Sequence, residues 1–87
     1  MSVVKKTEGR AISRRIIRVT IRLKLGRKIK ELRKKCGYTQ ERLSEAAKID
    51  YKYLQRIEGK KPPALKIDTI GKLARAMKVK PSKLLEF

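Results

Sequence analysis

Four polar side chains are spaced so that they share one face of a short predicted helix: Tyr51, Lys52, Gln55 and Arg56. Leu54 and Ile57 fall on the opposite face of that helix, toward a core. Lysine and arginine suit the acceptor atoms of guanine, and glutamine can pair with adenine or reach a phosphate. We therefore interpret the polar face as one that reads base edges; the alternative for each residue is a solvated surface side chain.

The sequence offers no comparable set of residues for catalysis. It contains no histidine and a single cysteine, Cys36, so it lacks the usual groups for acid–base chemistry and for metal binding. We predict that the chain is not an enzyme and uses no metal and no cofactor. Cys36 stands at the end of an apolar helical stripe, which favours a small buried side chain.

The charge of the chain points to a polyanionic partner. Its 87 residues suffice for one small domain, and 26 Lys and Arg against 8 Asp and Glu give a formal net charge of +18. DNA, RNA and an anionic membrane surface are the candidate partners. No apolar run approaches the roughly 20 residues of a membrane span, and a lone cysteine fits a reducing compartment. We expect a cytoplasmic, nucleoid-associated protein with no membrane partner.

Two short helices with a tight turn are predicted to position the polar face. Thr39 and Asp50 are each suited to cap the start of a helix, and Ile49 is an apolar residue in the turn between the two. This is the spacing of a helix-turn-helix, which presents its second helix, here about residues 50–58, to the major groove. The first helix crosses the DNA backbone, so Gln40 at its start is expected to bind phosphate.

The same stretch resembles the phage-repressor and Cro-like (Xre-type) family of bacterial DNA-binding domains, from about Leu25 to Phe87. The motifs that carry the resemblance are Thr39-Gln40, Leu43-Ser44-Glu45-Ala46-Ala47, Ile49-Asp50, Tyr53-Leu54, and Arg56-Ile57-Glu58 followed by Gly59-Lys60-Lys61-Pro62-Pro63. One position departs from the family pattern: Lys48 stands in the turn where the family usually has glycine. A left-handed conformation at Lys48 would cost roughly 1 kcal/mol.

The resemblance implies further roles for individual residues. It places Arg33 against Glu58 as an ion pair that joins the first helix of the domain to the end of the recognition helix. Lys60 and Lys61, just past that helix, fall where the family contacts phosphate. Gln40 falls where a family glutamine contacts DNA.

Apolar periodicity predicts three more helices. A stripe at Leu25, Ile29 and Leu32 marks the first, which Gly37 ends. A stripe at Ile67, Ile70, Leu73 and Met77 marks the fourth, in which Gly71 is interpreted as a point of close helix approach. Pro81 suits the first turn of a short fifth helix that contains Leu84 and Leu85. The expected fold is an all-α, five-helix, repressor-like domain over residues 25–87.

Residues 1–24 form a separate basic N-terminal arm in this interpretation. Residues 1–12 are expected to be an unstructured tail. Residues 17–24 alternate apolar and polar side chains, many of them β-branched, which predicts a strand. Three alternatives remain for the arm. Ile12, Ile16, Val19 and Leu23 also have helical spacing, the stretch could be disordered, and its arginines could lie along DNA phosphates.

These observations predict a sequence-specific, repressor-type transcriptional regulator that binds double-stranded DNA as a homodimer on a two-fold operator. A second hypothesis is an antitoxin-like or adaptor module whose N-terminal strand pairs with a protein partner, with DNA binding secondary. A third is a non-specific RNA or nucleoid binder, which the charge permits and the well-formed recognition helix disfavours.

Overall fold

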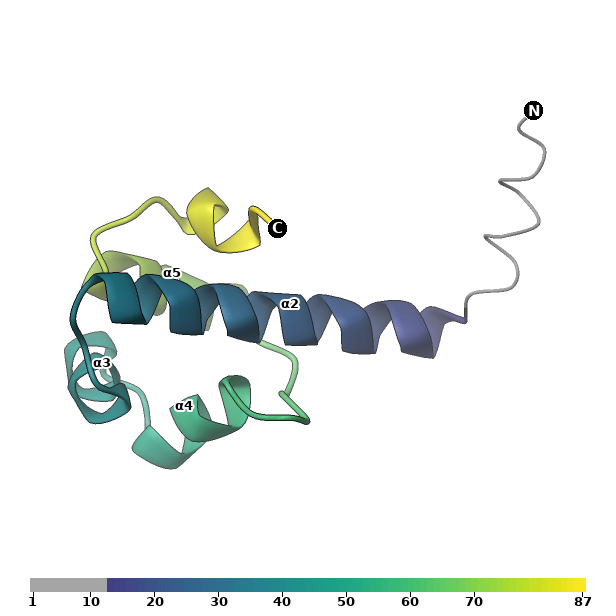
Figure 1. Ribbon diagram of the computed structural model, residues 1–87, viewed down its shortest axis with the longest axis horizontal. Helices are drawn as coiled ribbons and strands as arrows, with labels where there is room; N and C mark the ends of the chain where they lie inside the picture. Colours follow the sequence, from purple (N-terminus) through teal and green to yellow (C-terminus); the bar gives the residue numbers. More distant parts are fainter. Residues whose placement is uncertain (1–12) are drawn as a thin grey trace.

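The computed structural model describes residues 13–87, which form four α-helices and one 3-10 helix (Figure 1). In chain order they are α2 (Arg14–Lys35), α3 (Gln40–Ala47), α4 (Tyr51–Ile57), α5 (Ile67–Ala76) and the 3-10 helix η1 (Pro81–Leu85). The all-α class is as predicted, but the count of five α-helices is wrong, because the last element is a 3-10 turn. Its bonds span three residues, such as that from the Lys83 amide to the Lys80 carbonyl, as expected for so short a segment.

The predicted N-terminal strand is also wrong, because residues 17–24 are helical and residues 13–87 contain no strand. The alternating residues have helical spacing as well, and the helix that begins at Arg14 runs without a break into the core-forming residues from Leu25 onward. Ser13 caps its start, since the Ser13 hydroxyl accepts a hydrogen bond from the Ile16 amide at 3.1 Å. The tail predicted over residues 1–12 lies outside the described residues.

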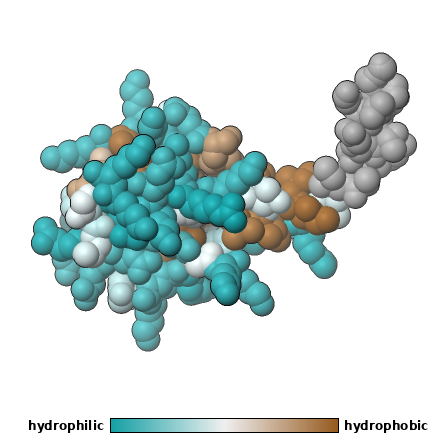
Figure 2. All heavy atoms as spheres, in the orientation of Figure 1, coloured by the Kyte–Doolittle hydropathy of each residue, from teal (hydrophilic) through white to brown (hydrophobic). Residues whose placement is uncertain are grey.

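Helix α2 has two parts with different surroundings. All of its buried residues lie from Leu25 to Arg33. The part before them, Arg14–Lys24, has no buried residue, and its N-terminal end extends past the rest of the domain (Figure 1); we call this part the overhang. Exposed aliphatic side chains gather on it (Figure 2). The core-forming part of α2 therefore belongs to the domain, and the overhang is an addition to it.

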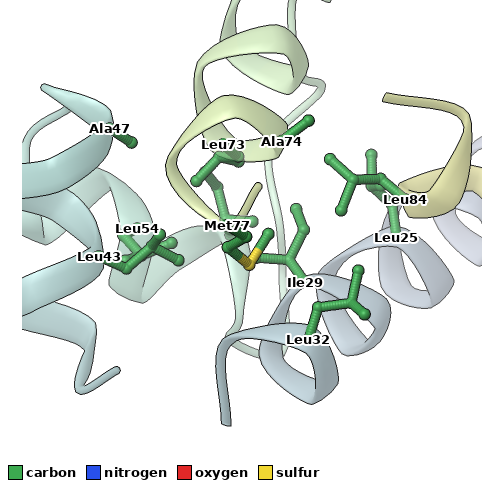
Figure 3. Packing of buried hydrophobic residues seen from close by; sticks show 11 residues of the cluster. Leu25, Ile29, Leu32, Leu43, Ala47, Leu54, Leu73, Ala74, Met77 and Leu84 are labelled. Carbon is green, nitrogen blue, oxygen red and sulfur yellow. The ribbon is translucent and has the colours of Figure 1, made fainter. Parts of the chain in front are cut away.

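The core lies between the second part of α2 and the other four elements. Its fully buried large side chains are Ile29, Leu43, Leu54, Ile57, Leu73 and Leu84. Figure 3 shows Leu25, Ile29 and Leu32 of α2 on one side of Met77, with Leu43 and Leu54 of α3 and α4 on the other. Each helix of the helix-turn-helix thus buries its apolar side, which leaves its polar side free for a ligand.

A close contact between α2 and α4 helps to fix the position of α4. A Cβ atom at Gly26 would overlap the backbone carbonyl oxygen of Ile57, at the last residue of α4. Only glycine lets the two helices approach this closely. Gly71, by contrast, is not at a close helix approach, since nothing lies within 4 Å of a Cβ built there.

The turn between α3 and α4 has the left-handed residue that the family pattern suggested. Lys48 has φ 58° and ψ 46°, and the Ile49 amide bonds back to the Ser44 carbonyl at 3.0 Å while the Lys48 amide bonds to the Glu45 carbonyl. This is the Schellman arrangement of a helix C-terminus. The turn therefore has its usual geometry, with a lysine in the place that favours glycine.

Candidate nucleic-acid interface

The polar face of α4 is exposed along its length. Asp50 caps the helix, since its carboxylate accepts a hydrogen bond from the Tyr53 amide at 3.3 Å. Leu54 and Ile57 are buried on the inner side. The four candidate base-reading residues all lie outside the core and are exposed: Tyr51, Lys52, Gln55 and Arg56. Because the buried side fixes the rotation of α4, these side chains face solvent together.

Gln40 lies at the start of α3 and is half-buried. The Thr39 hydroxyl caps this helix by accepting from the Arg42 amide at 3.1 Å. The Gln40 side chain also donates from Nε2 to Glu58 Oε1 at 3.0 Å, a contact that the sequence did not indicate. An amide nitrogen has two N–H donors, so the contact with Glu58 holds the side chain in place and uses only one donor of Gln40.

Arg33 and Glu58 form a two-pronged ion pair between α2 and the end of α4. Arg33 Nε donates to Glu58 Oε2 at 2.8 Å, and Arg33 Nη2 donates to Glu58 Oε1 at 3.0 Å. The side chains are 9% and 2% exposed, and Arg33 Nη1 also donates to the Tyr38 carbonyl at 2.8 Å. Glu58 thus receives hydrogen bonds from two helices, α2 and α3, and ties both to the C-terminus of α4.

Lys60 and Lys61 are exposed in the loop that follows α4. Lys60 shares a surface hollow with two basic residues of α2, Arg27 and Lys30, and the rest of its lining is Leu23, Glu58 and Gly59. The sequence places Arg27 and Lys30 on the polar face of a helix, but their proximity to Lys60 depends on how α2 packs on α4. The loop therefore belongs to a larger basic surface than its own two lysines suggested.

Cys36 is exposed, so its predicted burial is wrong. It is the C-cap residue of α2, so the helix ends there and the apolar stripe of α2 does not place Cys36 in the core. Its Sγ lies 3.6 Å from the Met77 carbonyl oxygen. Within residues 13–87, no three His, Cys, Asp or Glu side chains are grouped so that they could hold a metal. Over the same residues, none of the helices has the length and apolar character that crossing a membrane requires.

Comparison with known proteins identifies the class to which this architecture belongs. The helix-turn-helix family model HTH_3 matches residues 29–84. The structure is also similar to the crystal structure of the restriction-modification controller protein C.AhdI from Aeromonas hydrophila, with a TM-score of 0.69 and 30% sequence identity over 72% of this chain and 94% of that one. No curated protein matches the chain. The chain belongs to the Xre/Cro-like helix-turn-helix family and is a DNA-binding transcription regulator.

Proposed function

We propose that the protein is a sequence-specific regulator of the repressor type that binds a two-fold operator as a homodimer, with α4 in the major groove. The observation that supports this most directly is the exposed polar face of α4. The opposite, apolar side of the helix is buried in the core, and this fixes the direction in which the polar face points. An α-helix in the major groove meets a donor and acceptor pattern that differs for every base pair.

The proposal gives two groups of residues different tasks. Tyr51, Lys52, Gln55 and Arg56 contact base edges, with Lys52 and Arg56 suited to guanine. Gln40, Lys60 and Lys61 contact phosphates on either side of the groove and set the register of the protein on the duplex. The contact of Gln40 with Glu58 supports a phosphate-binding role for Gln40. This contact would link a phosphate contact of α3 to the C-terminal end of the recognition helix, α4.

A dimer follows from the size of the interface. One helix of seven residues contacts few base pairs, so a single domain would select its site poorly. Two domains related by a two-fold axis read a palindrome whose half-sites lie about one helical turn, roughly 10 base pairs, apart. The similarity to a restriction-modification controller protein supports a regulatory role.

Selection of duplexes from a random pool at physiological salt tests this function. The expected result is an enriched palindrome with half-sites about 10 base pairs apart, center to center. Insertion of about half a turn between the half-sites should then abolish tight binding. An unenriched pool would refute sequence specificity, and full affinity for the lengthened site would refute the dimer.

The adaptor hypothesis loses its structural basis. It depended on a strand over residues 17–24 that could pair with another chain, and those residues form part of helix α2. No backbone edge is available there, because the helix uses its own amides and carbonyls.

A further inference from the structure

The overhang of α2 carries five basic residues and no acidic one: Arg14, Arg15, Arg18, Arg22 and Lys24. The first acidic residue of α2 is Glu31, in its other part. None of the ion pairs of residues 13–87 involves the overhang. Its charge is therefore not neutralised within the part of the chain that the structure describes.

The overhang is also a helix that its own sequence disfavours. Arg14, Arg18 and Arg22 follow one another at four-residue spacing, where like charges repel. Positive charges in its first turns oppose the helix dipole, and several of its residues are β-branched, which lowers helix propensity. A partner that brings negative charge would remove both electrostatic costs.

We propose that the overhang is a second DNA-contacting element, which lies along the phosphate backbone beside the contacts of Lys60 and Lys61. This inference rests on the proposed function, since it adds a contact to that same complex. The matched family region begins at residue 29, after the overhang, so the contact would be an addition to the family interface.

Charge spacing supports DNA as the occupant. Eleven helical residues span about 16 Å, so the five basic residues provide about one positive charge per 3 Å. Each strand of B-DNA provides one phosphate per about 3.4 Å of its axis. Arg14, Arg18 and Arg22 share one face of the overhang at intervals of about 6 Å, so several of its charges can face phosphates of one strand together.

The overhang also adjoins the candidate interface. Leu23, at its end, lines the hollow that Arg27 and Lys30 share with Glu58 and Lys60. Arg18 and Arg22 line a different hollow, with residues of the loop after α4, of α5 and of η1. The overhang therefore begins next to the basic residues around Lys60, and its arginines extend the positive charge away from them along α2.

A second copy of the chain fits the overhang less well. Ile16, Ile17, Val19 and Ile21 are 45–55% exposed and could contact another helix. Packed helices lie about 8–10 Å apart, which is near the screening length at physiological salt, so two overhangs with five positive charges each would repel.

Two matched triple variants of the full chain test the proposal. Arg14, Arg15 and Arg18 are all exposed, and their replacement by glutamine removes three charges from the overhang. Lys78, Lys80 and Lys83, replaced in the same way, remove three charges near η1, on the other side of α2 from α4 (Figure 1). Thermal melting checks that both variants remain folded.

The measurement is the dependence of affinity on salt concentration, for one selected duplex and one scrambled duplex. The arginine variant should lower the salt slope by about two to three units on both duplexes, since each phosphate contact contributes about 0.9. The lysine variant should lower it by less than one unit. Equal effects of the two variants, or an unchanged slope for the arginine variant, would overturn the proposal and leave a protein partner as the occupant.

A position-specific readout completes the test. With Cys36 replaced by serine and the exposed Thr20 replaced by cysteine, a tethered iron–EDTA group at residue 20 should cleave the selected duplex at a few adjacent sugars at a constant distance from the half-site. Absence of local cleavage would contradict the proposed contact. Failure of the proposed function would appear separately, as equal affinity of the unaltered chain for the selected and scrambled duplexes.

Discussion

Replacement of Glu58 by alanine is predicted to destabilise the fold severely. The change leaves the Arg33 guanidinium buried with its Nε and Nη2 donors unpaired, and it removes the acceptor of Gln40. Removal of one partner from a buried ion pair costs about 3–5 kcal/mol. Small domains are stable by only about 5–15 kcal/mol, so this loss would be a large fraction of the total.

The predicted change in melting temperature follows from the size of the domain. For a chain of 60–100 residues, 1 kcal/mol corresponds to roughly 4–8 °C, so Glu58→Ala should lower the melting temperature by at least about 12 °C. Arg33→Ala should have a similar effect, because it leaves the Glu58 carboxylate buried and the Tyr38 carbonyl unpaired. Gln40→Ala should cost much less, since Gln40 is only half-buried.

A double-mutant cycle provides the decisive assay. Urea unfolding followed by circular dichroism gives the free energy of unfolding of the parent chain, the two single variants and the double variant. The double variant should lose much less than the sum of the single losses, because neither charge is then left without a partner. Glu58→Gln and Arg33→Lys form a milder cycle for use if an alanine variant does not fold. Additive losses, or a Glu58→Ala variant with an unchanged midpoint, would refute a shared buried pair.

Five smaller predictions concern single positions. Lys48→Gly should stabilise the protein by about 1 kcal/mol in urea unfolding, because glycine adopts the left-handed turn conformation without the cost to a side chain; a loss of stability would contradict this. Gly26→Ala should lower the melting temperature sharply, since its Cβ meets the backbone carbonyl at the end of α4, whereas Gly71→Ala, in open space within α5, should raise stability by about 1 kcal/mol. Arg56→Ala should weaken binding to the selected duplex by about 1–3 kcal/mol and relax the preference at particular base pairs, with a smaller loss on a scrambled duplex. Lys61→Ala should instead weaken both duplexes alike and lower the salt slope by about one unit, and a base-specific effect would exclude its role as a phosphate contact.

The local features of the helix-turn-helix could be predicted from the sequence because each depends on neighbouring residues. The caps at Thr39 and Asp50 each require a hydroxyl or carboxylate three residues before the amide that it accepts from. The buried Leu54 and Ile57 follow from helical periodicity alone. The base and phosphate contacts themselves remain predictions.

Other features could not be predicted because they depend on packing between distant segments. The contact of Gln40 with Glu58 and the proximity of Lys60 to Arg27 each join two elements whose relative position periodicity does not specify. The strand predicted over residues 17–24 is wrong because these residues satisfy both a two-residue and a helical period. Their continuity with the core-forming part of α2 decides in favour of a helix.

Three helix ends of the domain share the Schellman geometry of the α3–α4 turn, and only one has glycine. Gly37 after α2 has φ 76°, while Lys48 after α3 and Lys78 after α5 have φ 58° and 57°, and the matching bond runs from the Val79 amide to the Ala74 carbonyl. Natural proteins are rarely at their stability optimum. The two lysine caps are positions at which a substitution by glycine would raise the free energy of unfolding of this protein. Glycine at both would give a background that tolerates more substitutions on α4, and so a scaffold on which altered operator preferences can be evolved.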